Sequence, residues 1–261
     1  MARPATLTPL QQELMHYHEK LSHLPFHRLM QLADKNIIPR CLNKLRNNAP
    51  LCISCQFGQV HKRPWRSKGK RSNPIRKKSD NNIGDCVSTD QIVSAQPGLV
   101  PQMNGFLTSY RIWGVTIFVD HVTDYTYAHL MRELMLEETL LAKKAFEKLV
   151  AQHGKSVKRY HTDNGRYADK GFLEDTNSKD QSITFCGVRA HHQNGIVERR
   201  IRLITEISRT LLLRAQRPWP ECITIMLWPF AVKAAVDRLN NLTIDLNGQR
   251  PASRFYGTEN A

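Results

Sequence analysis

The sequence lacks several features that would place it in large classes of proteins. Its 261 residues contain no apolar run close to the roughly 18 residues that a membrane-spanning helix needs, and residues 1–10 lack the apolar stretch of a signal peptide. Its six cysteines show no regular framework of the kind that crosslinks small secreted domains. We therefore expect a soluble, intracellular protein with no membrane partner.

Acidic residues are scarce as well, and one long segment has none. The chain carries 38 Lys and Arg residues against 23 Asp and Glu residues, which gives a formal net charge of +15. Nine of the basic residues lie between His61 and Ser79, where there is no acid. Such an excess of positive charge favours a polyanionic partner. Two prolines, one glycine and few apolar residues indicate that residues 61–81 form a linker.

The charges of the linker favour contact with nucleic acid, but they allow two other interpretations. A solvated tether or a nuclear-import signal would have the same composition. If the linker binds DNA, its cations neutralise phosphates. The residues expected to do so are Lys62, Arg63, Arg66, Lys68, Lys70 and Arg71.

The apolar content of 41% allows one sizeable core and a smaller accessory domain. Two short helical patterns between residues 10 and 36 are separated at residues 22–25, and Pro25 fits the first turn of the second helix. We therefore predict a small helical domain over residues 10–60, followed by the linker and by a second domain over residues 82–261.

The second domain has the element order of an α/β fold. Runs rich in β-branched and aromatic residues predict strands at residues 86–93, 110–120, 125–133, 156–161 and 183–185. Helical periodicity predicts helices at residues 136–153, from residue 196 onward, and at roughly residues 221–240. A further helix is expected between the last two strands. This order predicts a layered α/β fold with a mixed sheet of five strands.

Three carboxylates that are far apart in the sequence fall where such a sheet could bring them together. Asp90 lies within the first predicted strand, Asp163 directly follows the fourth, and Glu198 lies near the start of a helix. Carboxylate oxygens on rigid elements are the ligands that Mg²⁺ and Mn²⁺ prefer. Two such ions about 4 Å apart can activate an attacking hydroxyl and stabilise the leaving oxygen of a phosphodiester. We expect Asp90 to bridge both ions, Asp163 to hold one and Glu198 the other.

Each acid taken alone has an ordinary explanation. Asp163 begins a good turn sequence, and Glu198 would be a favourable first-turn acid in any helix. Asp120 is the main competitor for a ligand position because it ends an apolar strand, and Asp124 is a weaker one. The combination of order, spacing and flanking residues indicates a catalytic metal site, although no single acid does.

A second constellation combines two histidines with two cysteines. His18 and His23 are followed, after 28 residues, by Cys52 and Cys55, and this is the ligand set of a tetrahedral structural Zn²⁺ site. Residues five apart point about 140° away from each other on a helix, so both histidines can bind one ion only if the helix breaks between them. The turn predicted at residues 22–25 supplies that break.

Metal binding would also explain how so small a hairpin folds. Two alternatives remain open. His16 and His27 are nearby candidates for the histidine ligands. The two cysteines could also be ordinary core thiols, with the histidines on the surface.

Taken together, these motifs resemble the integrase of copia-type long-terminal-repeat retrotransposons. The His/Cys segment resembles the family's amino-terminal zinc-binding domain, and the three acids fall on its catalytic triad. Residues 193–199, QNGIVER, are similar to the family's most specific motif. Residues 228–232, WPFAV, together with Asn240 and residues 255–257, FYG, resemble its downstream stretch.

The resemblance implies a ribonuclease H-like catalytic core and an enzyme, dependent on Mg²⁺ or Mn²⁺, that joins the 3′ ends of element DNA to target DNA. It also implies a multimer on double-stranded DNA, a location in the nucleus and in cytoplasmic virus-like particles, and an origin in a polyprotein. Besides those of the linker, the residues implied to contact DNA are Asn164, Gln193, Asn194, Arg199 and Arg202.

The chain departs from the family pattern in three places. Arg166 and Tyr167 follow the Asp163 turn directly, where an acid commonly precedes the aromatic residue. The connection over residues 93–109 is longer than expected, and the family's carboxy-terminal region does not follow residue 261. Two other functions are therefore weighed: a nucleic-acid-binding remnant that has lost its chemistry, and a ribonuclease H acting on hybrids. The His/Cys segment and the residue 193–199 motif argue against the second.

Overall fold

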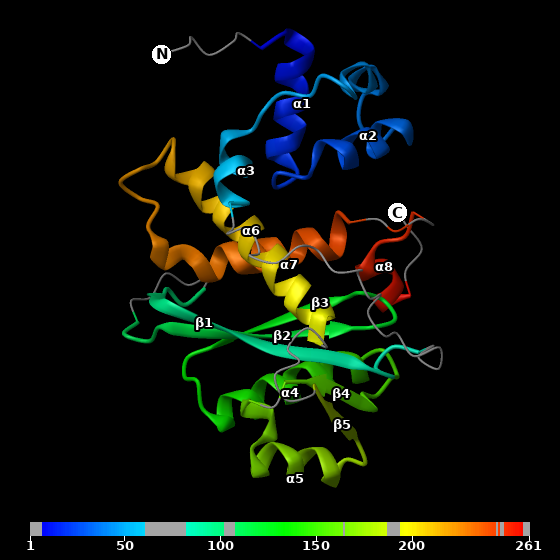
Figure 1. Ribbon diagram of the computed structural model, residues 1–261, viewed down its shortest axis with the longest axis vertical. Coiled ribbons are helices and arrows are strands. Elements are labelled where there is room, and N and C mark those ends of the chain that lie inside the picture. The colour runs from blue at the N-terminus through cyan, green and yellow to red at the C-terminus, as the bar shows by residue number, and fades with distance from the viewer. Residues whose placement is uncertain are drawn as a thin grey trace, which may run out of the picture.

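The computed structural model describes residues 7–60, 82–101, 108–163, 165–186, 194–243, 245 and 248–257. The predicted linker, residues 61–81, lies outside this part of the chain. Within it, a helical region (residues 8–60) packs on a sheet region (residues 82–257), in which helices cover both faces of the sheet (Figure 1). No helix of the described ranges is long and apolar enough to cross a membrane.

The helical region contains α1 (Pro9–Lys20), α2 (Phe26–Asp34), the 3-10 helix η1 (Arg40–Leu45) and α3 (Ile53–Gly58). A capping box between Thr8 and Gln11 begins α1. Ser22 and His23 both adopt left-handed backbone angles, with φ of 54° and 60°, and they turn the chain between α1 and α2. The predicted break at residues 22–25 is therefore confirmed. The periodicity does not predict η1 and α3, which are only six residues long each.

The sheet has the strand order β3-β2-β1-β4-β5. Its strands are β1 (Val87–Gly98), β2 (Ile112–Asp120), β3 (Thr126–Met131), β4 (Arg159–Thr162) and β5 (Ser182–Phe185). The first three strands form an antiparallel meander, and β4 and β5 run parallel to β1. This mixed five-stranded sheet is the ribonuclease H-like arrangement, and it confirms the predicted fold class.

Helices on the two faces of the sheet enclose two separate cores. On one face, α6 (Gly195–Gln216) and α7 (Trp228–Asn241) pack on apolar side chains of β2 such as Val115 and Ile117. On the other face, α4 (Leu136–Ala151) buries Phe146 against Phe118 and Tyr160. Next to α4 lie the short helix η2 (Arg166–Ala168) and α5 (Lys170–Ser178). The short helix α8 (Pro251–Tyr256) adds Phe255 to this second core.

Two predicted boundaries are wrong, one for a local reason and one because of a tertiary contact. The last long helix begins at Trp228 and not near residue 221, because Pro229 fits the first turn of a helix and the preceding residues form turns and the 3-10 helix η4 (Ile225–Leu227). β1 continues past Val93 to Gly98 after a register shift. There the indole of Trp228 donates to the Gln96 carbonyl oxygen at 3.1 Å, so the strand extension packs against the start of α7.

The helical region packs closely on α6 and α7. The Arg238 guanidinium of α7 donates to the carbonyl oxygen of Ser22 at 2.8 Å, and Leu242 joins the apolar core of the helical region. Gly58 lies so close to α6 that a Cβ atom there would be 2.9 Å from the Thr210 Cα. Only glycine allows this approach, so the end of α3 is fixed against the helix that carries Glu198.

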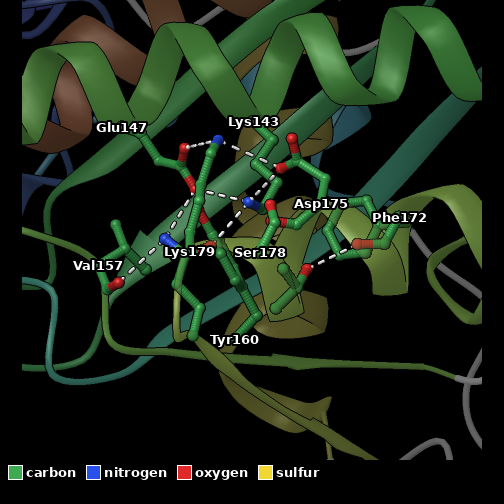
Figure 2. A network of polar contacts seen from close by, with 10 residues as sticks. Lys143, Glu147, Val157, Tyr160, Phe172, Asp175, Ser178 and Lys179 are labelled. Atoms are coloured by element: carbon green, nitrogen blue, oxygen red, sulfur yellow. Dashed lines mark hydrogen bonds and ion pairs between the residues drawn. The ribbon is translucent and has the colours of Figure 1, made fainter.

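A buried lysine joins α4 to the outer edge of the sheet (Figure 2). Lys143 has no exposed surface, and its Nζ lies 2.8 Å from Glu147 Oε1, 2.7 Å from Asp175 Oδ2 and 2.7 Å from Gln181 Oε1. Lys179 makes ion pairs with the same two carboxylates. Burial raises the pKa of Glu147 and of Asp175, but the hydrogen bonds from the two lysines outweigh it, and both pKa values are lowered. The network is a structural support for α5 and β5.

Candidate functional site

Four of the predicted metal ligands come together in the helical region. His18 lies in the last turn of α1, His23 follows in the left-handed turn, Cys52 precedes α3 and Cys55 lies within it. Their ligand atoms all lie within 4.8 Å of one another. His18, His23 and Cys52 are buried, and Cys55 is half-buried. The predicted set is therefore assembled by the turn between α1 and α2 and by the first turn of α3.

The distances within the cluster come within a few tenths of an ångström of those around a tetrahedral ion. His18 Nε2 lies 3.0 Å from His23 Nδ1 and 3.2 Å from Cys55 Sγ, and His23 Nδ1 lies 3.4 Å from Cys52 Sγ. A tetrahedral zinc ion, with Zn–N about 2.0–2.1 Å and Zn–S about 2.3 Å, separates its ligand atoms by roughly 3.3–3.8 Å. The four side chains therefore fit such an ion.

Hydrogen bonds to the ligands agree with this arrangement. The Nδ1–H of His18 donates to the Leu24 carbonyl oxygen at 2.9 Å, which leaves the lone pair of Nε2 directed to the cluster. A hydrogen bond from the Cys55 thiol lowers the pKa of Cys52, while the pKa of Cys55 is raised by the same bond. Neither His16 nor His27 belongs to the cluster, so these two alternatives are wrong.

The three carboxylates lie on separate elements around a fork in the sheet. β1 and β4 pair in parallel at Val87–Tyr160 and Ser88–His161. Asp90 and Asp163 each lie two residues beyond the last pair, where the two strands part. Glu198 lies in the first turn of α6. We call this point, where β1 and β4 separate, the fork.

The start of α6 is tied directly to β1. Asn194, the N-cap residue of α6, is buried, and its side-chain amide donates to the Thr89 carbonyl oxygen at 3.3 Å. The first turn of α6, and with it Glu198, is therefore held beside the residue that precedes Asp90. The hydroxyl groups of Thr89 and of the fully buried Tyr167 lie 3.0 Å apart.

One thiol experiences all three acids at once. Burial raises the pKa of Cys186, and the negative charges of Asp163, Glu198 and Asp90 raise it further. Burial also raises the pKa of Tyr167, and the charges of Asp90 and Asp163 add to this effect. The three carboxylates therefore lie near enough to Cys186, which follows β5, for their charges to act on it. The sequence patterns do not single out Cys186.

The carboxylates are nevertheless not as close together as the His/Cys ligands. Within the residues described, only His18, His23, Cys52 and Cys55 form a group whose ligand atoms all lie within 4.8 Å. Asp163 accepts a hydrogen bond from the Gly165 backbone at 3.2 Å, as expected for the turn that its sequence predicts. The fold thus places the three acids around one point without joining them in one tight cluster.

The structure assigns both competing acids to other tasks. Asp120 is fully buried, and its carboxylate accepts hydrogen bonds from Gly84 N at 2.9 Å, Thr123 N at 2.8 Å and Thr123 Oγ1 at 2.7 Å. These bonds hold the turn after β2. Burial raises the pKa of Asp120, which further disfavours a charged ligand there. Asp124 lies within 4.0 Å of guanidinium nitrogens of Arg200 and Arg254.

The residues predicted to contact DNA differ in where the structure places them. Arg199 and Arg202 are exposed on α6 beside Glu198. Asn194 is buried and ties α6 to β1, as described above. The remaining candidates lie outside the described residues: Lys62, Arg63, Arg66, Lys68, Lys70, Arg71, Asn164 and Gln193.

Comparisons with known proteins find similarity only at the level of three-dimensional structure. No protein-family model matches the chain. No curated protein sequence matches it either.

Among solved structures, the HTLV-2 integrase catalytic core domain in complex with magnesium aligns with a TM-score of 0.46 and 17% identity, over 66% of this chain and 96% of that one. A simian T-cell lymphotropic virus intasome in complex with the PP2A regulatory subunit B56 gamma aligns with a TM-score of 0.48 and 16% identity, over 70% of this chain and 60% of that one. The catalytic core domain of BIV integrase aligns with a TM-score of 0.45 and 15% identity, over 67% of this chain and 95% of that one. The fold assignment rests on the strand order of the chain itself.

Proposed function

We propose that the chain is a polynucleotidyl transferase of the integrase type, which joins DNA ends to a target strand with Mg²⁺ or Mn²⁺ as its cofactor. One observation carries the proposal: Asp90 and Asp163 each lie two residues beyond the last β1–β4 pair, and Glu198 lies in the first turn of α6, whose N-cap residue Asn194 donates to the Thr89 carbonyl oxygen. Three carboxylates held by separate elements at the fork are the donor set that a hard divalent cation requires.

The side chains around the fork have distinct roles in this function. Asp90, Asp163 and Glu198 would hold the cations. Bound there, the cations would activate the attacking hydroxyl and stabilise the leaving oxygen of a phosphodiester. Asn194 orients the first turn of α6 through its bond to Thr89. Arg199, exposed on the same turn, would neutralise a phosphate of the bound strand.

The His/Cys cluster supports a structural role for Zn²⁺ in the same protein. All four side chains are protein ligands, which is typical of closed structural sites and not of catalytic ones. We further propose that residues 10–60 are the zinc-binding domain, 61–81 the linker and 82–261 the catalytic core of a copia-type integrase, working as a multimer on double-stranded DNA in the nucleus and in virus-like particles. The ordered motifs at residues 193–199 and 228–232 support this assignment.

A strand-transfer assay tests the proposed chemistry. The full-length protein is incubated with a labelled DNA end and a plasmid target, with Mg²⁺ or Mn²⁺ added in separate series. Asp163→Asn should reduce joined product by at least roughly a hundredfold, because loss of a metal ligand costs no less than loss of a residue that merely orients one. Its thermal unfolding should stay that of the parent, since the hydrogen bond that Asp163 accepts from Gly165 lies within its own turn and can also be made to the side-chain oxygen of asparagine.

Asp180→Asn is the matched control. Asp180 is an exposed turn residue after α5 with φ of 54°, a conformation that asparagine tolerates as well as aspartate. This variant should join DNA like the parent. Joining that persists in Asp163→Asn would rule out the assigned site.

A nucleic-acid-binding protein without chemistry is the second candidate. It is favoured by the spacing of Asp90, Asp163 and Glu198, which do not form one tight group of ligand atoms in the described ranges. The same preparation decides between the two candidates. Salt-dependent DNA binding with no joined product in either metal would support this alternative.

A further inference from the structure

One residue of β1 contacts both of the other elements that meet at the fork. Thr89 directly precedes Asp90, and it is fully buried. Its carbonyl oxygen accepts the 3.3 Å hydrogen bond from the Asn194 side-chain amide at the start of α6. Its hydroxyl lies 3.0 Å from the hydroxyl of Tyr167 in η2. Thr89 therefore joins β1 to α6 with its backbone and to η2 with its side chain.

The two partners of Thr89 are close in the chain to the other two carboxylates. Asn194 is the N-cap residue of α6, four positions before Glu198 and thus about one helical turn from it. Tyr167 lies in η2, four positions after Asp163, and a backbone hydrogen bond to the Asp163 carboxylate closes the turn between them. Two hydrogen bonds of one residue thus connect the segments of all three acids. We call this pair of hydrogen bonds the Thr89 link.

The Thr89 link is shielded from water. Thr89 has no exposed surface, and Tyr167 and Asn194 are each 1% exposed. A buried polar group that loses its partner cannot replace it with water, so these bonds favour one arrangement of the three segments over others. Burial also raises the pKa of Tyr167, so its hydroxyl keeps its proton. The link therefore acts through geometry and adds no charge to the fork.

Tyr167 has a second partner, on β2. Burial has the largest effect on the pKa of Tyr167 and raises it, while hydrogen bonds with Thr89 and with Thr116 lower it in part. Thr116 lies on β2 and is fully buried. Tyr167 therefore keeps a hydrogen-bond partner when the Thr89 hydroxyl is removed. That removal should leave the fold intact and break only the bond between η2 and β1.

Metal ligands need such support where the sheet no longer supplies it. Within the residues described, the parallel pairs of β1 and β4 end at Ser88 and His161, and Asp90 and Asp163 lie beyond them. Mg²⁺ requires near-octahedral oxygen ligands at about 2.0–2.1 Å, and ligands must be held to within about 0.5 Å for a site to function. The Thr89 link supplies hydrogen bonds between the elements at the point where the strand pairs stop.

We propose that Thr89 is a positioning residue, whose two hydrogen bonds set the separation of Asp90, Asp163 and Glu198 and thereby the affinity of the fork for a divalent cation. The proposal rests on the proposed function, because it takes these three acids as the metal ligands. The Thr89 hydroxyl is no ligand itself, since it lies against Tyr167 in the interior. It acts through the carboxylates that its neighbours carry.

The test measures Mn²⁺ binding to the full-length protein without DNA, by electron paramagnetic resonance of the free ion. The protein is first loaded with Zn²⁺ and freed of the excess, so that the His/Cys cluster takes up no Mn²⁺. Binding that is present in the parent and lost in Asp163→Asn is binding at the fork.

Thr89→Val removes the hydroxyl and keeps the shape of the side chain, and Tyr167→Phe removes its partner. Each should weaken Mn²⁺ binding at the fork roughly tenfold, the lower end of the range for groups that support metal ligands. The double variant should bind no more weakly than Tyr167→Phe alone, because both changes remove the same bond. Thr89→Ser keeps the hydroxyl and should bind Mn²⁺ like the parent.

Two buried hydroxyl groups outside the fork provide matched controls. Thr176→Val removes a fully buried hydroxyl of α5 that donates to the Phe172 carbonyl oxygen at 2.7 Å. Tyr125→Phe removes a hydroxyl that lies 2.6 Å from that of Tyr256. Neither should change Mn²⁺ affinity. Equal losses in the controls would show a general effect of losing a buried hydroxyl and overturn the proposal, as would parent-like affinity in Thr89→Val and Tyr167→Phe.

Strand-transfer assays on the same proteins separate this proposal from the proposed function. If Thr89→Val and Tyr167→Phe bind Mn²⁺ more weakly than the parent but no protein joins DNA, the positioning role stands and the assigned chemistry fails. If the parent joins DNA and both variants bind Mn²⁺ and join DNA equally well, the reverse holds. A parent that binds Mn²⁺ no better than Asp163→Asn would overturn both.

Discussion

The helical region and the sheet region both gather metal-type ligands, but they do so in different ways. In the helical region, His18, His23, Cys52 and Cys55 have ligand atoms within 4.8 Å of one another and hydrogen bonds that set their orientation. In the sheet region, the charges of Asp90, Asp163 and Glu198 all raise the pKa of Cys186, but the three acids form no such group in the part of the chain described.

The chemistry of the ligands explains this difference. Imidazole nitrogens and thiols can pack together through hydrogen bonds, so the fold itself can bring them to ligand distance. Carboxylates at the same distance repel each other unless a cation lies between them. The sheet region has two apolar cores and a buried lysine network to stabilise it, whereas the helical region has one small core. Bound metal should therefore be required for folding of the helical region, whereas in the sheet region it should be required only for the chemistry.

Loss of the His/Cys cluster should have the largest effect on stability, and this effect should be confined to the helical region. Structural zinc contributes about 10–16 kcal/mol of apparent binding free energy in small zinc domains, more than a hairpin of this size can replace. Cys52→Ser should therefore lose bound zinc and hydrogen-exchange protection in residues 8–60. Protection of the sheet strands should remain. Zinc per chain and amide exchange by mass spectrometry measure the two effects.

Cys41→Ser is the control for this change, because Cys41 is exposed and lies outside the cluster. It should keep both zinc and protection. If Cys52→Ser retained full protection of residues 8–60 without metal, the fold of the helical region would not depend on the cluster. The proposed distinction between the two regions would then fail.

Replacement of the buried lysine should destabilise the sheet region and leave the helical region with its zinc site unchanged. Lys143→Met removes the fully buried one of the two lysines that contact Glu147 and Asp175, and breaking a buried ion pair in this way costs about 3–5 kcal/mol. The tryptophans Trp65, Trp113, Trp219 and Trp228 all lie outside the helical region, so urea unfolding followed by their fluorescence reports on the rest of the chain. Zinc content should not change.

The neighbouring residue provides the control for the lysine. Lys144 is exposed on the same helix, and Lys144→Met should unfold at the same urea concentration as the parent. A loss of zinc in Lys143→Met would show that the two regions unfold as one unit, contrary to the comparison.

The smallest expected effect is a change in how the stability of the sheet region depends on pH. The pKa values of Glu147 and Asp175 are lowered in the folded protein, so their contribution to stability is present above the ordinary carboxyl range and is lost as the pH falls through the folded values. The stability of the sheet region should therefore decline in acid. In Lys143→Met this decline should be shallower, because the bonds that lower both pKa values are weakened. An identical acid dependence in the two proteins would show that the network does not set it.

The sequence predicts the parts of the site that follow local patterns. Asp90, Asp163 and Glu198 could be placed because strand and helix signals flank each of them, and the His/Cys set because the turn at residues 22–25 is visible as a break in periodicity. The order of strands then gives the fold class. These features depend on neighbours in the chain, which the sequence displays directly.

The features that the sequence does not predict depend on distant contacts. Asp120 looks like a ligand in sequence, and only the approach of Gly84 and Thr123 shows that it holds a turn. Lys143 looks like an exposed residue of an amphipathic helix, and its burial depends on α5. Arg28, Arg199 and Arg254 come from α2, α6 and α8 and line one cleft, so no local pattern marks it.

The left-handed turn at Ser22 and His23 has a consequence for the rate at which metal leaves. Two consecutive non-glycine residues with φ of 54° and 60° are strained, each by roughly 1–3 kcal/mol, and they persist only while their surroundings hold them. The turn is therefore the place where the helical region opens first, and release of a bound ion and opening of the turn are one event. The rate of metal transfer to a strong chelator then reports the rate at which the turn opens. Ser22→Gly should lower this rate, because it removes strain from the turn.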